Sequence, residues 1–383
     1  MAEERVPILG LPLDGFLAAA KACGAFRSMS PQDVSALYRG FHRAGHVPAA
    51  GLPGWVHDGR RPVKAVHVDG ETLKFTMELG GDGLETESVV IPMRHRDGSV
   101  TRTLCVSSQV GCAMGCRFCE TAQMGLMRSL SPAEIVAQLH AARFAVANPW
   151  TGGNGFEIKN IVFMGMGEPM DNVESVLAAI RVLTDRNAHA IAPVHVTVST
   201  VGRTDGIRRY GEFMQQPGFH RLNLAVSLNA PNDRIRSEIM PINRAEPIAR
   251  LMQELLAFPK RPNAAICMEY VLIPGVNDAP EHCDEVCALL KPLRCSLNII
   301  PYNPRRASPW PAPTEESVQA FVRRAIDNGQ FCKRRGTKGR SAMAACGQLG
   351  NERIRARKHV DPAPEGAPDA RQETVQIRVD RAG

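Results

Sequence analysis

The sequence lacks the features that would send a chain into a membrane or out of the cell. It has no run of about 18 apolar residues, so no membrane-spanning segment is expected. Its first ten residues, MAEERVPILG, contain no basic stretch followed by an apolar run, so no secretory signal is predicted and we expect a cytoplasmic protein. The net charge of +7 over 383 residues gives only a mild preference for polyanionic partners.

Structural disulfides are rare in that compartment, so the 11 cysteines are expected to stay reduced unless they take part in chemistry. Four of them lie in apolar or amphipathic stretches and are interpreted as small buried hydrophobic residues: Cys267, Cys283, Cys287 and Cys295. The hydrophobic content of 44% and the charged content of 22% are those of an ordinary soluble globular protein. The length suits one large domain or two smaller ones.

The first hundred residues predict a mixed helical and β region. Residues 11–25 and 31–43 have helical spacing, and Ser30-Pro31 is a suitable start for the second helix. Residues 63–79 alternate around Asp69-Gly70, which predicts a β-hairpin, and residues 87–92 continue that small sheet. We therefore expect an N-terminal accessory region at 1–100, followed by a core at 101–350 and a poorly ordered tail at 351–383.

The core has a repeated strand–loop–helix pattern. Strands are predicted at 103–107, 160–164, 195–200, 222–227, 267–272 and 296–301. Amphipathic helices are predicted at 132–147, 172–186, 207–216, 247–258, 281–293 and 315–329. Six such alternations indicate an α/β fold with a parallel sheet, either an open doubly wound sheet or a partial barrel.

Polar loops follow the predicted strands and are expected to meet at one rim of the sheet, where the reacting groups of parallel α/β proteins collect. They are GMGEP at 165–169, ST at 199–200, SLNAPND at 227–233 and YNP at 302–304. The segment GCAMGCRFCETAQMG at 111–125, with three cysteines, directly follows the first predicted strand. These loops together predict a functional site.

Three interpretations compete for Cys112, Cys116 and Cys119. Structural zinc sites usually need a second pair of ligands, and no Cys or His nearby supplies one. A purely structural role is weakly supported, because this glycine-rich loop offers little apolar packing. An iron–sulfur cluster held by three thiolates fits best, and one iron of a four-iron cluster would then remain open to a small molecule.

The spacing Cys-x3-Cys-x2-Cys, with Phe118 before the last cysteine, resembles the radical S-adenosylmethionine (SAM) superfamily. The resemblance implies a partial (β/α)6 barrel and one [4Fe–4S] cluster per chain, whose open iron binds the amino and carboxylate groups of SAM. One electron from the cluster then breaks the sulfonium bond and yields a 5′-deoxyadenosyl radical. In that superfamily the turn matching GMGEP receives the amino group of SAM.

Two further cysteines narrow the resemblance. Cys105 in TLCVSSQVGC and Cys346 in AMAACGQLGN, together with CETAQMG, resemble the radical SAM adenosine methyltransferases of ribosomal and transfer RNA, the RlmN/Cfr family. The similarity covers roughly residues 63–350. It implies that Cys346 takes a methyl group from one SAM, and that a second SAM supplies the radical that activates this group toward C2 or C8 of adenine. Cys105 then attacks the Cys346 sulfur and releases the product as a transient disulfide forms.

The same resemblance implies further site residues and partners. Glu87 is the expected base for the ring proton, with Glu85 as the alternative. The implied SAM contacts are Gly167, Glu168, Ser199, Ser227, Leu228, Asn229 and Asn303. A structured RNA is the expected substrate, an electron donor such as flavodoxin or ferredoxin is required, and a monomer is expected. The basic runs at 93–98 and 332–340, the latter with five Lys or Arg residues in nine, are candidate contacts to RNA phosphates.

Three departures from the family pattern affect the substrate more than the chemistry. Asn229 stands in SLN where the family usually has SLH, and Glu120 stands in CETAQMG where it usually has CSTAQQG. Lys338-Gly339 is followed by Arg340, Ser341 and Ala342 instead of acidic residues. Two other functions remain open from the sequence: a radical SAM enzyme that activates a partner protein by making a glycyl radical, and a zinc-dependent RNA-binding protein.

Overall fold

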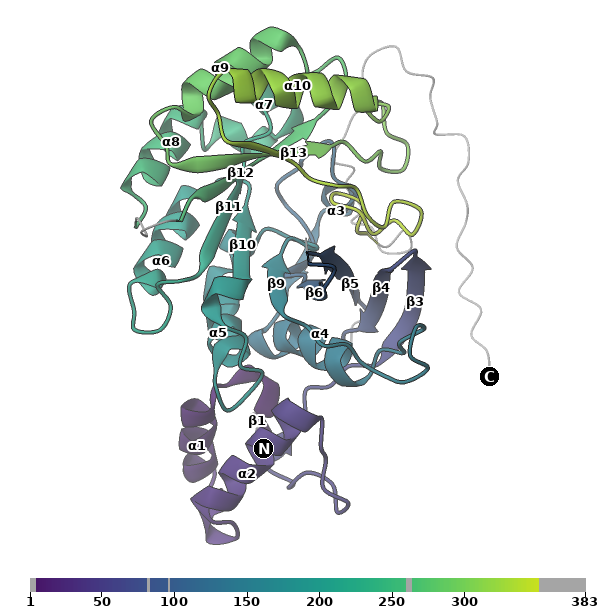
Figure 1. Ribbon diagram of the computed structural model, residues 1–383. Coiled ribbons are helices and arrows are strands. Elements are labelled where there is room, and N and C mark those ends of the chain that lie inside the picture. The colour runs from purple at the N-terminus through teal and green to yellow at the C-terminus, as the bar shows by residue number, and fades with distance from the viewer. Residues whose placement is uncertain (1–4, 81–82, 96, 260–263, 351–383) are drawn as a thin grey trace.

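A ten-stranded sheet curves around the centre of the molecule and carries helices on its outer face (Figure 1). The computed structural model describes residues 5–80, 83–95, 97–259 and 264–350, and the tail predicted at 351–383 lies outside them. The strand order is β3-β4-β5-β6-β9-β10-β11-β12-β13-β14. The strands are β3 (Val63–Asp69), β4 (Thr72–Glu78), β5 (Glu85–Arg94), β6 (Val100–Cys105), β9 (Asn160–Phe163), β10 (Val196–Thr200), β11 (Asn223–Ser227), β12 (Ile266–Leu272), β13 (Cys295–Pro301) and β14 (Cys332–Arg334).

Within this sheet, strands β6, β9, β10, β11, β12, β13 and β14 are all parallel and form the predicted partial barrel. The helices that accompany them are α4 (Pro132–Phe144), α5 (Val173–Thr184), α6 (Thr204–Met214), α7 (Asp233–Ile239), α8 (Ile248–Ala257), α9 (Pro280–Leu290) and α10 (Glu315–Asp327). Six of the parallel strands match the sequence prediction, whereas β14 and α7 were not predicted. The short strand β14 lies within the basic run at 332–340, where charge obscures the β pattern.

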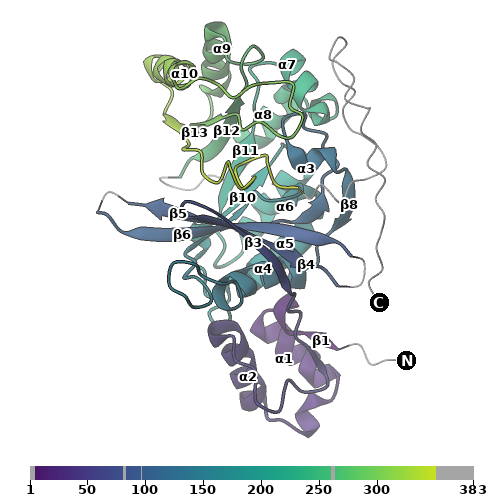
Figure 2. The ribbon, with the colours of Figure 1, turned by 90° about the vertical axis from the view of Figure 1, so that its right-hand side faces the viewer.

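The hairpin β3–β4 and strand β5 continue the barrel sheet in antiparallel fashion. Strand β5 pairs with β6, with Val89 opposite Cys105, so the expected small N-terminal sheet is an extension of the core sheet. Figure 2 shows β5 and β6 as long neighbouring strands that project beyond the barrel. This continuity fixes Glu87 and Cys105, on adjacent strands, relative to each other.

The N-terminal helices α1 (Leu13–Ala22) and α2 (Pro31–Ala44) pack at one end of the molecule, below α4 and α5 (Figures 1 and 2). Ser30 caps α2 in a capping box with Asp33, and Pro31 begins the helix, as predicted. The short strands β1 (Val6–Pro7) and β2 (Val56–His57) pair beside these helices. No helix among the described residues is long and apolar enough to cross a membrane.

Three buried histidines lie where the N-terminal helices meet the core. His42 in α2 places its Nδ1 3.4 Å from Nε2 of His189, and its Nε2 3.0 Å from the carbonyl oxygen of Ile8. His140 in α4 stacks on Phe41 at a ring-centroid distance of 4.7 Å. Burial lowers the pKa of His42 and of His140 to about 4. Burial, together with the neighbouring His42 and Arg143, lowers the pKa of His189 well below its usual range.

A small two-stranded sheet presents the clustered cysteines. Strand β7 (Gln109–Gly111) pairs with β8 (Leu126–Ser129), and the cysteines lie between β7 and the short helix α3 (Glu120–Gln123). The sequence predicted that the cysteines directly follow the first strand of the barrel. That prediction is wrong in detail, because β7 lies between β6 and the cysteines. Gly111 has a φ of +74°, and a Cβ there would lie 1.7 Å from the carbonyl oxygen of Gly125. Only glycine fits at this crossing.

Candidate active site

One cavity at the carboxyl ends of the parallel strands collects most of the predicted site residues. Those that line it are Cys112, Cys116, Cys119, Gly167, Glu168, Ser199, Ser227, Asn229, Asn303 and Cys346. The three predicted residues outside the lining are Leu228, Glu87 and Cys105. Leu228 is fully buried, and its N–H donates to the carbonyl oxygen of Glu269 at 3.0 Å.

The cysteine trio fits an iron–sulfur cluster better than a single ion. Among the described residues, no three Cys, His, Asp or Glu side chains converge closely enough to hold one metal ion. A four-iron cluster binds each thiolate through a different iron, so its ligands need not meet at a point. Burial is the main cause that raises the pKa of Cys112, Cys116 and Cys119, and neighbouring thiols add to it at Cys112 and Cys116. Three thiols in such a pocket ionise readily only with a cationic partner.

The turn after β9 closes one side of the cavity. Gly167 has a φ of +99°, and a Cβ there would lie 2.5 Å from the Cβ of Gln109. The Gln109 Oε1 in turn accepts the Glu168 N–H at 2.9 Å. The Glu168 carboxylate accepts the backbone N–H groups of Met170 at 3.0 Å and of Val201 at 2.9 Å, and burial raises its pKa to about 7. This carboxyl group therefore lies in the lining with a fixed orientation.

Arg236 in α7 organises the loops after β10 and β11, and the sequence reasoning missed it. Its side chain is fully buried. Its guanidinium donates to the carbonyl oxygens of Val201 at 2.5 Å, Ser227 at 3.3 Å and Leu228 at 3.1 Å. In the sequence DRIRSEI it looks like a charge on an exposed helix, and no local signal marks its burial.

Asn229 makes its contacts within the protein. It adopts the left-handed conformation with a φ of +57°, its Oδ1 accepts the Val271 N–H at 2.8 Å, and its carbonyl oxygen accepts from Asn277 at 2.7 Å. Asparagine tolerates this backbone conformation better than most residues. Asn229, which replaces the usual histidine of the family, therefore suits the backbone geometry of this turn.

A chain of polar contacts runs from Ser199, a predicted SAM contact, through Glu269 to Arg335. The Ser199 hydroxyl donates to Glu269 at 2.9 Å, and Arg335 donates to the other Glu269 oxygen at 3.1 Å. Arg335 also lines both this cavity and a second one beside it, and Cys346 is exposed to both. Burial and the neighbouring Cys346 raise the pKa of Cys105 to about 12, and Arg335 opposes that effect.

Cys346 itself lies half-buried on a loop, whereas Cys105 is buried at the end of β6, and both are free thiols. The Asn303 side chain donates to the Cys346 carbonyl oxygen at 3.4 Å. Arg340 donates to the Asn303 Oδ1 at 3.0 Å, so this departure from the family pattern contacts a predicted SAM contact.

Glu87 contacts the loop that carries Cys346 (residues 343–350, the Cys346 loop) and lies outside the cavity lining. Its buried carboxylate forms an ion pair with Lys74 at 3.1 Å and accepts the Gly350 N–H at 2.9 Å. The alternative, Glu85, pairs with Lys64 at 3.2 Å on the more exposed side. Glu87 thus contacts the loop that carries Cys346, through Gly350. Lys74 was not singled out from the sequence.

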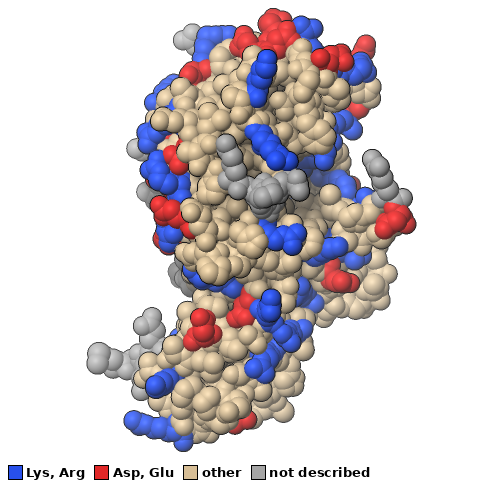
Figure 3. All heavy atoms as spheres, turned by 60° about the vertical axis from the view of Figure 1, so that its left-hand side comes forward, with Lys and Arg blue, Asp and Glu red and all other residues tan. Residues whose placement is uncertain are grey.

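The basic run at 332–340 is largely occupied by contacts within the protein. Its partners are Lys333 with the ring of Phe331, Arg334 with Glu315, Arg335 with Glu269, Lys338 with the Pro92 carbonyl and Arg340 with Asn303. On the face shown in Figure 3, basic and acidic side chains are intermixed. Charge alone therefore does not outline an RNA-binding surface there.

The other cysteines behave mostly as expected. Cys283, Cys287 and Cys295 are buried, in keeping with their interpretation as small hydrophobic residues. Cys267 is only half-buried and lines the second cavity together with Cys346.

Comparison with known proteins agrees with this geometry. Residues 106–287 match the Radical SAM superfamily. A probable dual-specificity RNA methyltransferase RlmN of Protochlamydia amoebophila is 40% identical over 297 residues, 78% of each chain. The dual-specificity RNA methyltransferase RlmN of Syntrophus aciditrophicus is 42% identical and covers 70% of this chain and 72% of its own.

A solved structure extends the similarity to the fold. A radical SAM methyltransferase from Sphaerobacter thermophilus superposes with a TM-score of 0.79 at 32% identity, covering 90% of this chain and 98% of its own. The similar sequences, the barrel fold and the cavity lined by the three cysteines all point to the same family. The chain therefore belongs to the RlmN family of radical SAM RNA methyltransferases.

Proposed function

We propose that this enzyme methylates an adenosine ring carbon, C2 in preference to C8, in ribosomal RNA, transfer RNA or both. The observation that supports this proposal most strongly is that Cys346 lines the same cavity as the three clustered cysteines. The relatives named dual-specificity RNA methyltransferases support an RNA substrate. An enzyme that activates a partner protein has no use for this second pair of thiols, and a zinc-dependent RNA-binding protein has no use for an open position beside the trio.

Cys112, Cys116 and Cys119 would hold a [4Fe–4S] cluster, which when bound supplies the electron that cleaves SAM. Glu168 and Ser199, both fixed by hydrogen bonds in the cavity wall, would orient the SAM molecule. The buried wall excludes water from the reacting groups, which protects a radical from side reactions.

Cys346 would act first as a nucleophile. Its sulfur bonds to the methyl carbon of SAM, the sulfonium–methyl bond breaks and S-adenosylhomocysteine leaves. A thiol carrier is needed because the C2 and C8 atoms of adenine are electron-poor and do not attack a sulfonium methyl group. The location of Cys346 on a loop between two cavities lets one sulfur face SAM and then the base.

Cys105 and Glu87 would complete the reaction. The radical made from the second SAM would remove a hydrogen atom from the Cys346 methyl group, and the resulting methylene carbon would bond to the ring carbon. Glu87, held by Lys74 beside the loop, would take the ring proton, and the remaining electron would return to the redox centre held by the three clustered cysteines. Cys105 attacks the Cys346 sulfur, the carbon–sulfur bond to the product breaks and a disulfide forms. Burial raises the pKa of Cys105 to about 12, and the charge of Arg335, which opposes that effect, would assist the ionisation that this attack needs. A reductant reopens the disulfide, and a protein such as flavodoxin or ferredoxin supplies electrons for SAM cleavage to this enzyme, which we take to act as a monomer.

The test uses anaerobically purified protein and the Cys346→Ala variant. The variant is expected to lose RNA methylation and to keep reductive SAM cleavage, measured as 5′-deoxyadenosine. Cys105→Ala is the companion variant and is expected to leave RNA covalently attached to the enzyme. Colourless, iron-free wild-type protein, or full methylation by Cys346→Ala, would refute the proposal. Mass spectrometry of RNA from cells with and without the gene identifies the modified carbon and the RNA class.

A further inference from the structure

We propose that Glu120 and Arg306 form a latch that binds the Cys346 loop, residues 343–350, to the segment that follows the cluster cysteines. This latch sets the position of the Cys346 sulfur in the cavity. The inference rests on the proposed role of Cys346 as methyl carrier. It makes Glu120 and Arg306 positioning residues, since neither reacts itself.

Glu120 is a buried carboxylate that pairs with Arg306. It directly follows Cys119, and only 2% of its surface is exposed. One carboxylate oxygen accepts the Arg306 backbone N–H at 3.1 Å, and the other accepts the Arg306 guanidinium at 3.3 Å. A buried charge is costly unless it is paired, so the ion pair with Arg306 stabilises this carboxylate.

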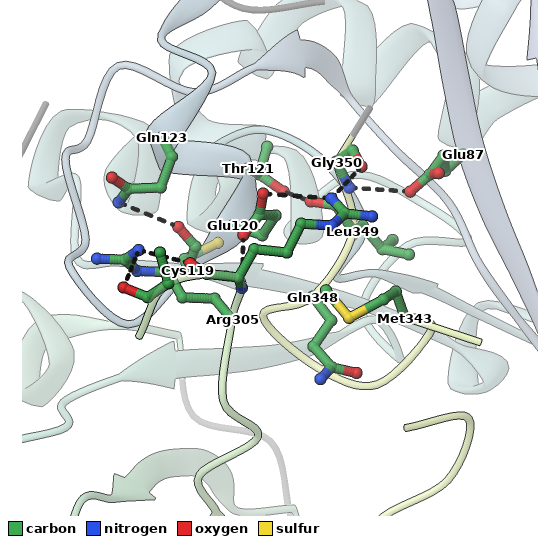
Figure 4. Close-up of polar contacts among 12 residues, drawn as sticks. Glu87, Cys119, Glu120, Thr121, Gln123, Arg305, Met343, Gln348, Leu349 and Gly350 are labelled. Carbon is green, nitrogen blue, oxygen red and sulfur yellow. Dashed lines mark hydrogen bonds and ion pairs between the residues drawn. The ribbon is translucent and has the colours of Figure 1, made fainter. Parts of the chain in front are cut away.

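The same two residues reach the Cys346 loop. The Glu120 N–H donates to the Gly347 carbonyl oxygen at 2.7 Å, and Arg306 donates to the Gly350 carbonyl oxygen at 3.3 Å. The Thr121 hydroxyl donates to the Leu349 carbonyl oxygen at 2.5 Å. Figure 4 shows Glu120 and Thr121 directed toward Leu349 and Gly350. The backbone that follows Cys346 is therefore tied to the backbone that follows a cluster ligand.

The loop is also held from the sheet side. Glu87 accepts the Gly350 N–H, and in Figure 4 it approaches Gly350 from the side opposite to Glu120. Lys74 donates to the Met343 carbonyl oxygen at 3.4 Å, at the start of the loop. The fit is close, because a Cβ at Gly350 would lie 3.0 Å from the Cγ of Glu120. Of these restraints, those from Glu120, Arg306 and Thr121 join the loop to the cluster segment.

Such a restraint matters for the reaction because hydrogen transfer between two carbons needs them in near contact, about 3–3.5 Å apart. A displacement of roughly 1 Å can cost about a hundredfold in rate. If the loop is released, SAM cleavage continues while the methyl group on Cys346 is misplaced. The expected signature is uncoupling, in which more 5′-deoxyadenosine forms for each methylated RNA.

The experiment compares Glu120→Ser and Arg306→Met with a matched control, Asp284→Asn. The control removes a second Arg–carboxylate ion pair, Asp284 with Arg324 at 2.5 Å, which lies on the exposed side of α9 and α10. Two readouts are measured: the ratio of 5′-deoxyadenosine to methylated RNA, and hydrogen–deuterium exchange of the peptide that covers 343–350. Both latch variants are expected to raise the ratio about tenfold or more and to speed exchange in that peptide. The control should change neither.

The outcomes separate this inference from the proposed function. Wild-type protein that makes no methylated RNA refutes the function, and the exchange measurement still tests the latch. Active wild-type protein whose latch variants keep both the ratio and the exchange rate overturns the latch. A loss of iron in Glu120→Ser without faster loop exchange also overturns it, because Glu120 would then act on the cluster ligands. Arg306→Met lies outside the cysteine segment and supplies the second test if Glu120→Ser does not fold.

Discussion

Lowering the pH from 7.5 to 5.5 is expected to weaken the packing of the N-terminal helices on the core, through the buried histidines. His42 and His140 are neutral in the folded protein because burial lowers the pKa of each to about 4. The unfolded chain has histidines with a pKa near 6.5 and binds protons more readily. The stability that these residues contribute is therefore complete above pH 6.5 and falls as the pH drops toward 4.

The size of the effect follows from the two pKa values. Consider a histidine whose pKa is 6.5 in the unfolded chain and about 4 in the folded protein. When the pH falls from 7.5 to 5.5, each such histidine lowers the free energy of unfolding by about 1.3 kcal/mol. His189 adds to the loss in the same direction. His140→Phe isolates one contribution, because phenylalanine keeps the ring packing between Phe41 and Phe144 and cannot be protonated. Within the described part of the chain, the His140 Nε2 has no hydrogen-bond partner, so the substitution removes only the ring's hydrogen bond with the Phe41 backbone.

The assay is urea unfolding at the two pH values, followed by tryptophan fluorescence. Trp55 reports on the N-terminal helices, since its ring lies 5.5 Å from that of Phe16. The fall in unfolding free energy between pH 7.5 and 5.5 should be about 1.3 kcal/mol smaller in His140→Phe than in wild type. Equal falls in the two proteins would show that His140 is not the neutral buried group described here.

Two further substitutions test the framework of the site. Gly111→Ala forces a Cβ onto the Gly125 carbonyl oxygen and should lower iron content and stability, whereas Gly98→Ala, at a φ of +81° with open space around it, should lose only about 1–2 kcal/mol and no iron. Equal effects of the two substitutions in melting and iron assays would contradict the steric argument. Arg236→Met leaves several buried carbonyl groups unpaired and should cost about 3 kcal/mol or more in denaturant unfolding, with weaker SAM binding by calorimetry. An unchanged SAM affinity would show that Arg236 does not shape the cavity.

The fold was largely predictable because its periodicity is local. Six parallel strands alternate with amphipathic helices, and each pattern can be read within about ten residues. The continuity of the hairpin with the barrel was not predictable, because the pairing of Val89 with Cys105 joins segments whose patterns do not show their neighbours. Strand β7 was missed for a similar reason, since three residues are too few to show alternation.

The residues of the candidate site likewise fall into those that a local motif predicts and those that depend on distant partners. Residues in motifs, such as Cys112 and Cys346, could be placed by resemblance. Lys74, Arg236 and Arg335 could not, because a cation that is paired within the fold has the same sequence signature as a solvated one. Their roles depend on carboxylates and carbonyl groups brought together from distant parts of the chain.

The unbroken sheet limits how the polypeptide can be shortened. A fragment that began at the proposed boundary near residue 100 would bare the edge of β6, leaving its ladder of amide and carbonyl groups open to pairing with other molecules. It would also discard Glu87 and Lys74, the supports beneath the Cys346 loop. A truncation meant to isolate the barrel should therefore start before β3, at about residue 60.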